Sequence, residues 1–251
     1  MIVSTEFLHE QDKTLTRRIF AETPFKSWLD SAHENDFDAV CDYVYGASLA
    51  EISCGSVLEM RDLACEKFGI EQFKIYCVRD YDLEISCVGY HSPAVLIPNS
   101  LIDCANEEIL QARLYAAAAA VATGHHRLKF FTWAAENMSG VASLPVIGKA
   151  MIALLYEWNR VQQYSLDRAV LLATDNIELA LKNILFGIIP QNLLENFRFG
   201  SDDDTFLKQT ERYFRNENPA QIIGKVFSYF SNYSWLPLRY DELRKFYQSQ
   251  R

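Results

Sequence analysis

The sequence predicts an α+β protein that is mainly α-helical, folds as one domain and contains a small antiparallel sheet. Only ten glycines and seven prolines occur in 251 residues, which favours long helices over many short strands. Hydrophobic residues make up 49% of the chain, which suits a packed core and excludes global disorder. Within a single domain at 1–251, we expect a helical N-terminal part at 1–70, a sheet at 71–98 and a helical part at 99–251.

The first hundred residues contain helical patterns followed by strand patterns. The predicted helices span 14–20, 24–45 and 56–68. The last of them ends at Gly69, because glycine is typical of the residue that terminates a helix. Three short runs rich in aromatic and β-branched residues follow, at 73–78, 83–88 and 94–97. Turn-like segments separate these runs, so we expect them to pair as a three-stranded antiparallel sheet.

From residue 99 onward the pattern is helical. Asn106, Glu107 and Glu108 are typical of a helix start, because Asn caps free N–H groups and acidic side chains suit the positive end of the helix dipole. This helix runs through five consecutive alanines at 116–120. Further helices are expected at 145–173, 177–186, 204–214, 220–230 and 241–248. Thr174 or Asp175 is expected to cap the helix at 177–186.

Charge and cysteine usage narrow the class of protein. The formal net charge of −9 argues against a nucleic-acid partner, because neutralising phosphates requires a basic surface. No CxxC pair occurs, so the six cysteines favour free thiols in a reducing compartment over a structural zinc site. The sequence has neither a signal-peptide pattern nor an apolar run of the ~18 residues that span a bilayer. We therefore expect a cytoplasmic protein without stable membrane insertion.

Two phrases share their order and spacing with a known family. The first runs without gaps from Leu101 to His125, and the second, at 158–169, reads Trp-Asn-Arg-Val-Gln-Gln-Tyr-Ser-Leu-Asp-Arg-Ala. Together they resemble the zinc metallopeptidases of the heat-shock HtpX and CAAX prenyl-protease type. That family has a strand, a zinc helix with the pattern HExxH and a second helix with the pattern ExxxD. The resemblance implies a metallopeptidase-like, zincin-like helical scaffold.

The residues that zinc catalysis needs are absent at the matching positions. The HExxH pattern falls on 116–120, so that Ala116 and Ala120 replace the ligand histidines and Ala117 replaces the general base. The third ligand falls on Gln163, which has no charge and is a poor zinc ligand. Of the second phrase, Asp167 and Arg168 remain. The resemblance makes Asp167 a residue that orients a ligand histidine. Without that histidine, we expect it to pair with Arg168 or Arg160.

Several other residues are candidates for chemistry or contacts. His125 and His126 are adjacent, so their rings diverge, and we expect cationic side chains at a helix end. A relocated metal site built from these two histidines and Cys104 is an alternative. The aromatic cluster at 227–237 is expected to pack on the core or to form a partner surface. Leu236-Pro237, Arg239 and Glu242-Leu243 are similar to a closing phrase of the family that also contains a histidine, which is missing here.

The function predicted from the resemblance is that of a pseudoenzyme: a HExxH-lacking, metallopeptidase-like protein without metal or cofactor. It would bind a peptide or protein partner, for example as the non-catalytic subunit or scaffold of a complex with an active peptidase relative. The oligomeric state stays open. The vestigial active-site positions are Ala116, Ala117, Ala120, Gln163, Asp167 and Arg168.

Two alternatives stay open beside this prediction. The first is an enzyme that uses the former cleft for non-zinc chemistry. Its candidate groups are Gln163, Asp167, Arg168, Tyr115 and His125. The second is an unrelated helical adaptor. In that case the strand–helix–helix arrangement around Ala116 and Gln163 would be absent.

Overall fold

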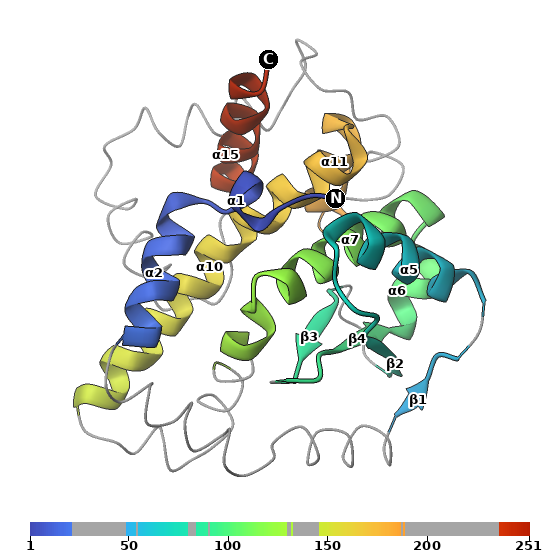
Figure 1. Cartoon of the computed structure of the whole chain (residues 1–251), viewed down its shortest axis with the longest axis horizontal. Coiled ribbons are helices and arrows are strands. Elements are labelled where there is room, and N and C mark those ends of the chain that lie inside the picture. Colours follow the sequence, from blue (N-terminus) through green and yellow to red (C-terminus); the bar gives the residue numbers. More distant parts are fainter. Residues whose placement is uncertain are drawn as a thin grey trace.

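A computed structural model of the chain (Figure 1) describes residues 1–21, 49–53, 55–79, 84–89, 91–129, 132, 146–186, 188 and 236–251; for 146–151 it describes the backbone only. The predicted helices at 24–45, 204–214 and 220–230 lie outside the described residues, as do Cys41 and Cys54. The same holds for the aromatic cluster except Leu236 and Pro237. The described part is mainly helical with a small mixed sheet, consistent with the α+β class.

The N-terminal helices confirm two of the predictions. The first helices are α1 (Ser4–Phe7), α2 (Glu10–Ala21) and α5 (Ser56–Phe68). Helix α2 begins four residues before the predicted start, with acidic Glu10 and Asp12 in its first turn. Helix α5 has the predicted bounds. Gly69 follows it with a φ of 64° and donates its N–H to the carbonyls of Cys65 and Glu66. This left-handed conformation explains why a glycine ends the helix.

The sheet differs from the prediction in two respects. Its strands are β1 (Ala50–Glu51), β2 (Lys74–Val78), β3 (Ser86–Val88) and β4 (Ala94–Pro98), in the order β1-β2-β4-β3. Among the described residues it therefore has four strands, and β2 and β4 are parallel, with Ile75 opposite Val95. Strand β3 pairs antiparallel with β4, where Cys87 lies opposite Val95. The prediction of a purely antiparallel three-stranded sheet was wrong.

The apolar sequence of β4 explains its place in the sheet. All five residues of Ala94–Pro98 are apolar, and four of them are buried. A strand that is apolar at every position is typical of a strand covered on both faces, which is commonest in the interior of a sheet. The hairpin of β3 and β4 is therefore placed so that β4 pairs with β2, and the shorter β3 lies at the edge.

The second half of the described chain consists of helices. They are α6 (Asn99–Cys104), α7 (Glu107–Ala122), α10 (Val146–Thr174), α11 (Ile177–Leu185) and α15 (Leu236–Ser249). Asn106 caps α7 as predicted, because its side chain accepts the N–H of Ile109 at 2.9 Å. The cap of α11 is Asn176, which accepts the N–H of Leu179 at 3.1 Å. Thr174 or Asp175 was the wrong prediction, since Asp175 turns the chain with a φ of 50° and leaves Asn176 extended.

Helix α7 is central among the described elements. It packs against α5, α10, α11 and β3, while α10 also packs against α2 and α15. The alanines at 117–120 are at most 3% exposed, and their small side chains allow neighbouring elements to approach closely. Helix α15 begins at Leu236, five residues before the predicted start, with Pro237 in its first turn where a proline is tolerated. None of the described helices is both long enough and apolar enough to cross a membrane.

Candidate functional site

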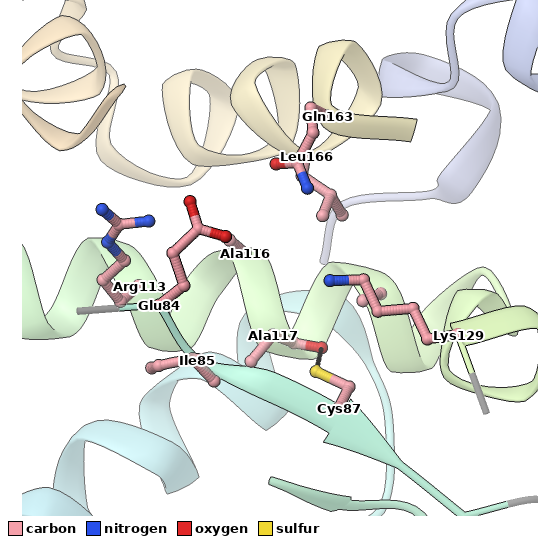
Figure 2. Close-up of a pocket in the computed structure, with 10 residues that line it drawn as sticks. Glu84, Ile85, Cys87, Arg113, Ala116, Ala117, Lys129, Gln163 and Leu166 are labelled. Carbon is pink, nitrogen blue, oxygen red and sulfur yellow. Dashed lines mark hydrogen bonds between the residues drawn. The ribbon is translucent and has the colours of Figure 1, made fainter. Parts of the chain in front are cut away.

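The positions that the resemblance assigns to zinc ligation converge on one pocket (Figure 2). Ala116, Ala117 and Ala120 line it from α7, and Gln163 lines it from α10. Cys87 of β3 lines another side and donates its Sγ–H to the carbonyl oxygen of Ala117 at 3.8 Å. We call this site the alanine pocket; its other lining residues are Glu84, Ile85, Arg113, Lys129 and Leu166. The strand–helix–helix arrangement around Ala116 and Gln163 is therefore present.

The alanine pocket is small and open to solvent. Its volume is about 40 Å³. A water molecule needs roughly 10–15 Å³ of such space, so the pocket holds about three waters or a group of similar size. The alanine side chains present methyl groups, which neither bind a metal ion nor transfer a proton. The geometry thus offers a place for a small group but no reactive side chain on α7 at the three vestigial positions.

Charged side chains lie around this pocket. Burial raises the pKa of the Glu84 carboxyl, but the positive charges of Arg113, Arg239 and Lys129 outweigh it, so the pKa is lowered. Glu84 is therefore ionised at neutral pH. Arg113 donates an N–H from Nη2 to the carbonyl oxygen of Phe186 at 3.4 Å. In Figure 2 the side chains of Glu84 and Lys129 reach toward the space between α7 and α10.

Sequence analysis missed these three charged residues. Arg113 had a usable signal, because it lies three residues before Ala116 and four before Ala117, on the same helix face. Glu84 and Lys129 had none, since one precedes a short strand and the other lies in a separate helical segment beyond α7. Only tertiary structure places them at the pocket.

Asp167 and Arg168 lie away from the alanine pocket. The Nε and Nη2 atoms of Arg239 donate to the two carboxylate oxygens of Asp167 at 2.8 and 2.7 Å, and both side chains are buried. Arg168 lies near Glu242, with Nη2 at 3.7 Å from Oε2, and over the ring of Phe246. The expected pairing of Asp167 with Arg168 or Arg160 was wrong, because α15 brings a better-oriented arginine to it. Burial lowers the pKa of Arg239, but Asp167 outweighs this and raises it.

A second buried polar group joins α2 to α10. The carboxylate of Asp12 accepts hydrogen bonds from Ser165 at 2.5 Å and Thr16 at 3.2 Å, and Nε2 of His125 lies 3.2 Å from it. Trp158 donates its indole N–H to the hydroxyl of Thr16 at 3.1 Å. Burial raises the pKa of Asp12, but His125 and the hydrogen bonds outweigh it and lower the pKa. We call these residues, together with Asp167 and Arg239, the anchor cluster.

His125 does not lie exposed at the end of α7. Helix α7 ends before Gly124, whose φ of 75° turns the chain, and residues 125–129 start a new helical segment. His125 is 2% exposed and packs edge-on against Trp158. The neighbouring His126 lines a separate, larger hollow of about 400 Å³, so the two rings diverge as predicted. Since His125 is buried in the anchor cluster, it is not available to a ligand in the alanine pocket.

The alternative groups for chemistry are not brought together. Of the five groups considered for non-zinc catalysis, Gln163 alone lines the alanine pocket. Tyr115 packs against Phe68, with ring centroids 6.5 Å apart. Within the described ranges no group of three His, Cys, Asp or Glu side chains is close enough to hold a metal ion, so the relocated metal site is not formed there.

The four described cysteines are free but differ in exposure. Cys65 and Cys87 are buried, Cys77 is half-buried and Cys104 is exposed. Burial raises the pKa of the Cys87 thiol to about 11, so it stays protonated and acts as a hydrogen-bond donor.

No family model, no curated protein and no solved structure matches this chain.

Proposed function

We propose that this chain is a catalytically inactive metallopeptidase-like protein that binds an extended peptide, or an extended segment of a protein partner, between β3, α7 and α10. One observation carries the proposal. Ala116, Ala117, Ala120 and Gln163, selected from the sequence as the positions of the zinc ligands and the general base, lie around one pocket beside an edge strand. An active peptidase relative is one partner of this kind, and the chain would then be its non-catalytic subunit.

The side chains in the pocket support the proposed absence of catalysis. Metal-assisted hydrolysis needs ligands for the metal and a base for the attacking water. The alanine methyl groups supply neither, and Gln163 supplies a neutral amide. Reuse of the cleft for other chemistry has less support, because Asp167 and His125 are buried in the anchor cluster.

Peptide binding follows from the strand beside the pocket. Strand β3 is last in the sheet order, and among the described strands β4 alone pairs with it. The free backbone groups of such an edge can pair with an added extended chain, while nearby pockets take its alternate side chains. Cys87 connects this edge directly to α7. A peptide that pairs with β3 would therefore pass over the alanine pocket.

Metal content is the first test of this proposal. We expect the purified chain to contain far less than one zinc ion per molecule by elemental mass spectrometry, even after incubation with zinc. It should also leave an unfolded protein substrate intact. One bound zinc ion per chain together with cleavage of the substrate would contradict the proposal.

Blocking the pocket is the second test. A library of fluorescein-labelled octapeptides would be titrated against the wild type, Ala116→Leu and Ala122→Leu. Both alanines are half-buried on α7 and pack against the same hydrophobic core, but Ala116 alone lines the pocket. We expect Ala116→Leu to weaken the best peptides about tenfold or more and Ala122→Leu to leave them unchanged. The proposal fails if no peptide binds, or if both variants bind like the wild type while their thermal midpoints show that they are folded.

A further inference from the structure

The described residues that line the alanine pocket carry an excess of one positive charge. The charged ones among them are Glu84, Arg113 and Lys129, one acid against two bases. Asp167 and Arg239, which do not line the pocket, neutralise each other through two hydrogen bonds. The chain as a whole has a net charge of −9, so a locally positive pocket is not a reflection of overall composition.

Lys129 provides the unbalanced charge. Arg113 and Arg239 lower the pKa of the Glu84 carboxyl more than Lys129 does. In Figure 2, Lys129 lies on the side of the pocket opposite Arg113 and Glu84, and its ammonium group points into the pocket, toward the side where Glu84 lies. It is half-buried and has no ion pair with a carboxylate in the described part of the chain. A half-buried ammonium group gains stability when an anion binds beside it.

The pocket wall suits a carboxylate. The alanine methyl groups add no charge of their own to the wall on which a small planar anion would lie. The side-chain amide of Gln163 adds a neutral hydrogen-bond donor on the opposite side. The volume of about 40 Å³ accommodates a group of carboxylate size but not a continuing peptide chain.

We propose, on the basis of the proposed function, that the alanine pocket receives the C-terminal carboxylate of the bound peptide, with Lys129 as its ion-pair partner and Gln163 as a hydrogen-bond donor. The peptide pairs with β3 and its last residue reaches the pocket, whose volume of about 40 Å³ suits a carboxylate. The positive charge that a metal ion would supply in a peptidase is supplied here by an ammonium group.

The test uses the labelled octapeptide library in three forms: free C-terminal acids, C-terminal amides, and amides with an internal Asp or Glu. We expect the acids to bind the wild type about 10- to 100-fold more tightly than the amides, the range of a charge-assisted hydrogen bond. Lys129→Gln should abolish this preference, and Lys129→Arg should restore part of it. The matched control is Lys182→Gln, since Lys182 is also half-buried but does not line the pocket.

Each contrary result has a distinct meaning. Equal binding of acids and amides to the wild type overturns the carboxylate assignment while leaving peptide binding intact. If amides with an internal acidic residue bind as tightly as the acids, then the pocket does not distinguish the terminal carboxylate from other carboxylates. An unchanged preference in a folded Lys129→Gln variant also overturns the assignment. If none of the three forms binds, the proposed function itself fails.

Discussion

The anchor cluster and the alanine pocket both include residues from the same segment of α10, but the side chains of that segment have different surroundings in the two regions. Trp158, Ser165 and Asp167 face buried partners on α2 and α15, and their polar groups are joined by hydrogen bonds or ion pairs. Gln163, within the same phrase, faces a pocket whose wall consists of methyl groups. The same short segment of α10 therefore serves both the packing of the helices and the wall of the pocket.

The largest expected effect comes from breaking the buried ion pair. Arg239→Met leaves the Asp167 carboxylate buried without its partner, which should lower the free energy of unfolding by about 3–5 kcal/mol. Urea denaturation followed by circular dichroism measures this change.

Arg244→Met is the matched control on α15. Arg244 is half-buried and has no ion pair with another described residue, so we expect a change below about 0.5 kcal/mol. Replacing both partners, Asp167→Leu with Arg239→Met, should recover much of the lost stability. If Arg239→Met lowers the free energy of unfolding as little as Arg244→Met does, then the ion pair between Asp167 and Arg239 does not stabilise the fold.

The next effect concerns the buried carboxylate on α2. Asp12→Asn keeps the shape of the side chain but removes the charge that His125, Ser165 and Thr16 contact, so we expect a loss of about 1.5–3 kcal/mol. Asp103→Asn, at an exposed position, should change little. Peptide affinity should be the same in both folded variants, because the anchor cluster does not line the pocket. If Asp12→Asn alone weakens peptide binding, then the anchor cluster contributes to binding and is not separate from the alanine pocket in function.

Acid should weaken the contacts that α15 makes near the anchor cluster. The hydrogen bond from His9, together with Lys245, holds the pKa of Glu242 at about 2, well below its ordinary value of 4.5, although burial raises it. Since the folded pKa is lowered, this contribution is complete above about pH 4.5 and is lost as the pH falls toward 2. The stability advantage of the wild type over Glu242→Gln should therefore shrink between about pH 5 and about pH 3 in urea titrations. If the stability difference between the wild type and Glu242→Gln stays constant over this range, then Glu242 does not have the lowered pKa. Glu66→Gln, at an exposed position, serves as the control.

The smallest expected effect concerns the cap of the helix that forms the pocket wall. Asn106→Ala removes the acceptor for the N–H of Ile109 and should cost about 1 kcal/mol of stability. Asn106→Ser keeps a capping oxygen and should cost less. Thermal unfolding measures both variants. If removal of the cap costs as much as Arg239→Met, then α7 depends on its local start signal more than on the packing around it.

Local signals in the sequence predicted the helices but not the contacts between them. The end of α5 at Gly69 and the start of α7 at Asn106 depend on neighbouring residues and were correct. The order of strands depends on which element covers β4, which no local pattern encodes. The family resemblance, and no local pattern, grouped the alanines of α7 with Gln163 of α10, and these residues line one pocket. In contrast, Lys129 lies at the pocket because the chain turns at Gly124, and the direction of that turn cannot be predicted from the local sequence.

The position of α10 between the two ends of the described chain has a consequence for synthesis on the ribosome. Helix α2 contacts it from the N-terminal side through Asp12, and α15 contacts it from the C-terminal side through Arg239. While the chain is being made, α10 emerges before its second partner exists, and the carboxylate of Asp167 must stay hydrated until then. The nascent chain can assemble the sheet, α5 and α7 early, but the last helix has to leave the exit tunnel before α10 is fully packed.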